Sequence, residues 1–172
     1  MLSAPKVASH TEQPYVAIVS TVSQDEIASK LPPLIGEVKA WLEQHHIDSD
    51  MPPFFRYQAW KDNNHFEVAV GIPVKDPVKG DDRVRGGAFP AGKFAYATHT
   101  GDFKYLRDAH MQLVDWMEKN QLKEQYQLTK DGKQVGTRIE FYMNDPTKIP
   151  NPEEWKTDIV VYLGTDDIHL YH

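Results

Sequence analysis

A glutamate and a tyrosine stand two positions apart in a strand-like run of the sequence. The run is Ile139-Glu140-Phe141-Tyr142-Met143, and alternate side chains of a β-strand point to the same face. Glu140 and Tyr142 should therefore share one face, while the three apolar residues share the other. A carboxylate that loses its hydration among aromatic rings should have a raised pKa and should attract a cation or a hydrogen-bond donor.

Two kinds of chemistry, and one purely structural interpretation, are open to this pair. A lipophilic cation would gain a counter-charge, and neighbouring rings would add a cation–π attraction of about 0.5–2 kcal/mol. A carboxylate with a raised pKa can also act as a general acid or base, so Glu140 could serve catalysis as well as binding. In the structural interpretation, both side chains face solvent, because charged side chains are seldom buried without a partner.

The elements that position these residues follow from apolar periodicity. Runs rich in β-branched and aromatic residues predict strands at 15–23, 54–60, 65–74, 83–91, 93–100, 135–143 and 157–164. Apolar spacings of three and four predict a helix within 24–47, whose main part begins at the prolines 32–33, and a second helix over 103–120 capped by Asp102. The order strand, helix, strand, strand occurs twice, so an α+β fold with pseudo-two-fold symmetry is expected.

Two segments are predicted to lack regular structure. Residues 1–13 are polar and without periodicity, so we expect a flexible N-terminal lead-in to a single domain over 14–172. Residues 144–155, NDPTKIPNPEEW, are too rich in proline for a strand.

Composition excludes several functions. The 172 residues carry a net charge of −6, with 25 acidic against 19 basic side chains, which argues against nucleic acid and anionic membranes as partners. The absence of cysteine excludes disulfides and thiolate sites. No apolar run suits a signal peptide or a membrane span, which indicates the cytoplasm. The eight histidines show no metal-ligand spacing, and no nucleotide-binding or triad motif occurs, so neither metal nor cofactor is expected.

Several motifs in their order resemble the GyrI-like small-molecule-binding domain, which also serves as the effector domain of AraC-type and MerR-type multidrug regulators. They are YVAIVS, WLEQHHID followed by FFRYQAW, FEVAVGIPV, FPAGKFAYATHTGDFKYL and IEFYMNDP, and they cover nearly all of 14–163. The resemblance implies a duplicated β-α-β-β (SHS2-like) fold with a ligand groove between its halves. No helix-turn-helix segment precedes residue 14, so a stand-alone form of the domain is expected.

The resemblance also implies roles for particular residues. The family's pocket glutamate, which meets the positive or polar part of the ligand, corresponds to Glu140, and its tyrosine corresponds to Tyr142. Tyr57 matches the family's aromatic residue in the hairpin strand. Four further aromatic strand residues are expected to line the groove, although each alone is more often a core residue: Trp60, Phe89, Tyr96 and Tyr162.

Three functions follow from the resemblance. The favoured one is binding of a small apolar or cationic organic molecule, for sensing, sequestration or toxin resistance, by a monomer or a weak homodimer. The second is hydrolysis of strained electrophilic rings, with Glu140 as the catalytic acid or base and the hydroxyl of Tyr142 or Tyr57 as the helper that positions the substrate. The third is an interaction with DNA gyrase like that of the family's gyrase inhibitor.

Overall fold

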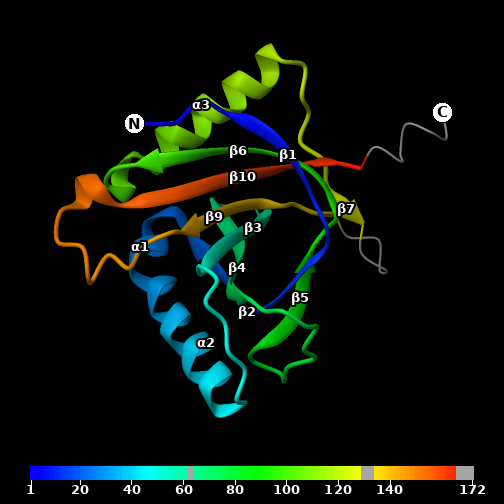
Figure 1. The fold of residues 1–172 in the computed structure, drawn as a ribbon, viewed down its shortest axis with the longest axis vertical. Helices are drawn as coiled ribbons and strands as arrows, with labels where there is room; N and C mark the ends of the chain where they lie inside the picture. Colours follow the sequence, from blue (N-terminus) through cyan, green and yellow to red (C-terminus); the bar gives the residue numbers. More distant parts are fainter. Residues whose placement is uncertain (62–63, 129–133, 166–172) are drawn as a thin grey trace.

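A curled antiparallel sheet of eight strands is the centre of the computed structural model, which describes residues 1–61, 64–128 and 134–165 (Figure 1). The strand order across the sheet is β1-β6-β10-β9-β3-β4-β2-β5. The bounds are β1 Lys6–His10, β2 Gln13–Ser23, β3 Phe54–Lys61, β4 His65–Pro73, β5 Arg85–Phe89, β6 Gly92–Thr100, β9 Arg138–Tyr142 and β10 Lys156–Gly164. A separate short pair joins β7, Gln127–Leu128, to β8, Gln134–Val135.

Two longer helices stand over the sheet, one toward each end (Figure 1). They are α2, Pro32–Gln44, which follows η1, Gln24–Glu26, and α1, Ile27–Lys30, and α3, Leu106–Lys119, which follows η2, Phe103–Tyr105. A short turn, η3, Pro152–Glu154, lies in the proline-rich loop, which contains no strand, as predicted.

The predicted helix starts are confirmed. Helix α2 begins at Pro32, where a proline costs no hydrogen bond because the first backbone N–H groups of a helix have no acceptor within it. The Asp102 side chain accepts a hydrogen bond from the backbone N–H of Lys104 at 3.1 Å and so caps η2, the turn that leads into α3.

The N-terminal residues differ from the expectation. Residues 6–10, for which the sequence pattern predicts no element, form β1, an edge strand that pairs antiparallel with β6. Leu2 adds an isolated bridge to His99. Four of the five residues of β1 are exposed, so this strand needs no apolar alternation, and its backbone pairing leaves no periodic signal in the sequence.

The two faces of the sheet differ. We call the face on which α2 and α3 pack the helical face. Residues of α2 pack on β2 and β4, and residues of α3 pack on β6 and β10. Strands β9 and β3 are neighbours at the centre of the sheet order and therefore lie between these two helix-covered regions. Each strand of this pair is followed outward by two helix-covered strands, β10 and β6 beyond β9, and β4 and β2 beyond β3. A duplication of the two halves stays a prediction.

The opposite face carries an aromatic core and a buried arginine. Phe54, Phe89 and Tyr15 form edge-on and tilted ring contacts there. Arg56 on β3 is 4% exposed. All of its guanidinium nitrogens donate to neutral acceptors: Gly136 O (3.2 Å), Tyr15 OH (2.8 Å), Ala88 O (3.2 Å), Gln127 Oε1 (2.9 Å) and Thr137 Oγ1 (2.8 Å). Arg56 therefore ties β2, β3, β5, β7 and the segment before β9 together.

Candidate functional site

Glu140 lies at the centre of the helical face, on β9. Its neighbours in register are Phe55 on β3 and Ile159 on β10, both of which are buried. Glu140 itself is only 5% exposed. The interpretation in which this carboxylate faces solvent is therefore wrong, and a buried carboxylate needs partners to remain charged.

Three side chains donate hydrogen bonds to the Glu140 carboxylate. The hydroxyl of Tyr142, from the same strand, donates to Oε1 at 2.6 Å, which confirms that the two residues share a face. The hydroxyl of Tyr57, from β3, donates to the same oxygen at 3.2 Å. Nε2 of His110, from α3, lies 2.7 Å from Oε2 and completes the set. The site thus joins two strands and a helix around one carboxylate.

The charge state of the site differs from the expectation. Burial raises the pKa of Glu140, but the hydrogen bond and charge of His110, together with the two tyrosine hydroxyls, more than offset it. The pKa of Glu140 therefore lies below its usual value, and the expected rise is wrong in direction. Burial raises the pKa of Tyr57 and Tyr142 well above that of free tyrosine, and the nearby Glu140 charge raises both further. Both phenols therefore stay protonated and donate to an ionised carboxylate.

A line of aromatic rings extends from both sides of Glu140. On one side Tyr57 contacts Phe66 at 6.4 Å between ring centroids, and Phe66 contacts Trp60 at 6.1 Å. On the other side Tyr142 contacts Phe103 at 5.6 Å, and Phe103 contacts Trp155 at 4.5 Å. We call these six residues the aromatic row: Trp60, Phe66, Tyr57, Tyr142, Phe103 and Trp155. It combines apolar area with ring faces suited to a cation.

A buried hydroxyl lies beside the row. Thr157 on β10 pairs in register with Tyr142 and, two positions from Ile159, points to the helical face. It is fully buried, and its Oγ1 has no hydrogen-bond partner among the residues that the structure describes. Buried polar atoms normally have partners, so this hydroxyl is an exception among the described residues.

The structure does not bring all the predicted site residues together. Glu140, Tyr142 and Tyr57 are in direct contact, and Trp60 ends the aromatic row, half-exposed, with the Arg138 guanidinium 5.5 Å from its ring. Three others lie on the opposite face of the sheet. Phe89 packs in the aromatic core, the Tyr162 hydroxyl donates to Ala91 O at 3.0 Å, and Tyr96 pairs in register with Val160, which packs against that core.

His110 is the site residue that sequence reasoning missed. It stands in the apolar stripe of the helix predicted over 103–120, among Leu106, Leu113 and Met117, which are buried against the sheet. A histidine in such a stripe must either find a polar partner or stay neutral. That signal indicates a buried partner, but the sequence does not show which strand supplies it.

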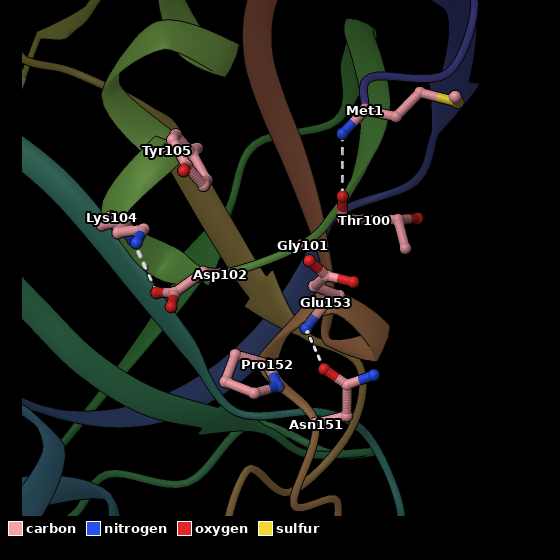
Figure 2. A pocket seen from close by; sticks show the side chains of 9 residues that line it. All are labelled: Met1, Thr100, Gly101, Asp102, Lys104, Tyr105, Asn151, Pro152 and Glu153. Carbon is pink, nitrogen blue, oxygen red and sulfur yellow. Dashed lines mark hydrogen bonds between the residues drawn. The ribbon is translucent and has the colours of Figure 1, made fainter.

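A surface hollow of about 490 Å³ lies apart from Glu140 (Figure 2). It is lined by Met1, Thr100, Gly101, Asp102, Lys104, Tyr105, Asn151, Pro152 and Glu153. Two of its polar side chains serve the local backbone: Asp102 accepts from the Lys104 N–H, and Asn151 accepts from the Glu153 N–H. We therefore assign the candidate site to Glu140, where buried charge and aromatic area coincide, and not to this hollow.

Within the described ranges, the residues meet the requirements of neither a metal site nor a membrane-spanning helix. No cluster of His, Asp or Glu side chains there is suited to holding a metal ion. None of the helices in the same part of the chain has the length and apolar character needed to cross a membrane.

Comparison with known proteins agrees with this fold. The EcmrR C-terminal domain has a TM-score of 0.66 at 20% identity, with 94% of this chain and 98% of that domain covered. In the EcmrR–DNA complex, this chain spans 57% of the longer EcmrR chain. SAV2435, solved bound to tetraphenylphosphonium, has a TM-score of 0.66 at 11% identity, with 99% of both chains covered. A hydrolase from Listeria innocua has a TM-score of 0.57 at 16% identity, with 91% of this chain and 90% of that chain covered.

Sequence comparison gives the family. A search of curated protein sequences finds no match to this chain. A family model does match it, over residues 9–163. With nearly the whole chain matched, this protein belongs to the family of the GyrI-like small molecule binding domain.

Proposed function

We propose that this chain binds a small lipophilic organic cation on the helical face, with Glu140 as the counter-charge. The observation that carries the proposal is the buried carboxylate of Glu140 within the aromatic row; its lowered pKa favours the charged form. An ionised carboxylate in a poorly hydrated site attracts cations strongly, because the surrounding medium screens its charge less than water does.

Three further features support this choice. The rings of the aromatic row offer cation–π contacts and apolar area to the same ligand. The buried Thr157 hydroxyl beside Tyr142 has no partner among the described residues, so a ligand that entered the site would meet one unpaired polar group there. A protein of the same fold, SAV2435, was solved with tetraphenylphosphonium, a lipophilic cation. In this chain, such binding would serve sensing, sequestration or resistance to a toxic cation.

A pair of probes with matched shape tests this function. Tetraphenylphosphonium and tetraphenylborate have four phenyl groups each and opposite charges, so they separate charge recognition from simple apolar burial. Tetraphenylphosphonium should quench tryptophan fluorescence saturably, because Trp60 and Trp155 end the aromatic row. Tetraphenylborate should bind at least about a hundredfold more weakly, since a buried like charge costs several kcal/mol. Equal affinity for both probes, or no saturable binding of the cation, would contradict the proposal.

Hydrolysis of strained electrophilic rings is a second candidate, favoured by the contact between the ionised Glu140 and the protonated Tyr142. With an epoxide, Glu140 would take a proton from water as the water oxygen bonds to a ring carbon. The C–O bond would break, and the Tyr142 hydroxyl would give its proton to the leaving oxygen, yielding a diol. Proton return from Glu140 to Tyr142 would restore the site.

Turnover separates this candidate from binding alone. If the chain is a hydrolase, styrene oxide should give the diol faster than in buffer, and Glu140→Gln should lower kcat by about a hundredfold or more. Diol formation at the buffer rate in the presence of the protein would contradict hydrolysis of this substrate class. The cytoplasmic location, the monomer or weak homodimer and the gyrase interaction stay predictions.

A further inference from the structure

We infer that His110 is the resident cation of this site, and that an organic cation binds as His110 releases its proton. The inference rests on the proposed function, because it assumes that the ligand pairs with Glu140. It adds a residue that determines specificity and links cation binding to pH.

The geometry makes His110 the charged partner of Glu140. The imidazole Nε2 lies 2.7 Å from Oε2. The two side chains are 16% and 6% exposed, so water screens the attraction between their charges only weakly. The other oxygen, Oε1, is occupied by the neutral hydroxyls of Tyr57 and Tyr142. A protonated imidazole therefore brings this buried group to zero net charge.

Other ionisable groups of the helical face are neutral or paired elsewhere. Tyr57 on β3 presents its ring edge-on to the imidazole, with 6.5 Å between centroids. Arg138 on β9 makes a bidentate ion pair with Glu124, at 2.8–3.1 Å. His99 on β6 contacts the Asp102 carbonyl oxygen at 3.2 Å. On α3 itself, the neighbouring charged residues are exposed: Arg107 and Asp108.

Electrostatics then couples the ligand to the proton. If His110 kept its proton, a bound monocation would leave one positive charge unpaired in a buried site, which is costly. Loss of the proton on Nε2 restores neutrality and removes the hydrogen-bond donor to Oε2, so this oxygen can face the ligand's charge. The proton and the organic cation thus compete for Glu140. Where His110 is protonated in the free protein, the apparent affinity should fall about tenfold for each pH unit of acidification.

Calorimetry of tetraphenylphosphonium binding to the whole chain tests this linkage. Titrations in buffers of different ionisation enthalpy, between about pH 5 and about pH 8, report the protons released. The wild type should release about one proton per cation at the acidic end. His110→Gln keeps an N–H donor for Glu140 but has no imidazole charge. Because burial of Glu140 is then no longer offset by His110, the variant's Glu140 can itself take up a proton at the acidic end. The two proteins are therefore compared at about pH 7, where His110→Gln should release fewer protons than the wild type and should bind the cation at least as tightly.

Two controls keep the result interpretable. His46→Asn changes an exposed histidine after α2, at a backbone φ of 56° that asparagine tolerates, and should behave as the wild type. Should His110→Gln fail to fold, proton release by the wild type alone still decides the inference. Cation binding without proton release at any pH would overturn the inference and leave the proposed function intact. Absence of cation binding in the wild type and His110→Gln alike would overturn the proposed function itself.

Discussion

Replacing Glu140 by glutamine should weaken tetraphenylphosphonium binding by about a hundredfold, because removing one member of a buried charge pair costs about 2–5 kcal/mol. Glutamine has nearly the same shape, and its amide oxygen can still accept a hydrogen bond from Tyr142. The variant therefore removes the negative charge while the aromatic row remains in place. Tryptophan quenching and calorimetry at neutral pH measure the change in Kd.

Matched variants separate charge at this position from charge elsewhere. Glu140→Asp keeps the carboxylate but withdraws it by one methylene group, so its affinity should fall between those of the wild type and Glu140→Gln. Glu37→Gln removes an exposed carboxylate that pairs with Arg83 on the surface, and it should leave Kd unchanged. If Glu140→Gln bound the cation as tightly as the wild type, the carboxylate would not be the counter-charge and the proposed site would be wrong.

Replacing Arg56 by methionine should lower the free energy of unfolding by about 3–5 kcal/mol, although Arg56 forms no ion pair among the described residues. The substitution would leave several acceptors without a donor, including the buried Thr137 hydroxyl and the Gly136 carbonyl. Methionine fills much of the same volume, so the loss measures mainly the hydrogen bonds. Urea denaturation followed by circular dichroism gives this free energy.

Arg83 is the matched control for this second prediction. It is an exposed arginine whose pair with Glu37 should contribute only about 0–1 kcal/mol, so Arg83→Met should be close to the wild type. Because Arg56 lies on the face opposite Glu140, folded Arg56→Met should still bind tetraphenylphosphonium with the wild-type Kd. An unfolding free energy within about 1 kcal/mol of the wild type would show that β2, β3 and β5 hold together without Arg56.

Local patterns in the sequence determined both longer helices, most of the strands but not β1 or β7, and one important pairing. Helix α2 begins at Pro32 because a proline is tolerated in the first turn of a helix. Glu140 and Tyr142 share a face because side chains alternate strictly along a strand. Both properties depend on residues close in the chain, so one sequence suffices to predict them.

Only the tertiary structure decided which face the helices cover and what meets Glu140 there. Phe89, Tyr96 and Tyr162 have the same strand-like context as Tyr57, yet the register of the sheet turns them to the opposite face. His110 reaches Glu140 from a helix thirty residues away, and its charge reverses the expected direction of the Glu140 pKa shift. Long-range packing sets both results, because a carboxylate's pKa depends on the groups that surround it in space and not on its neighbours along the chain.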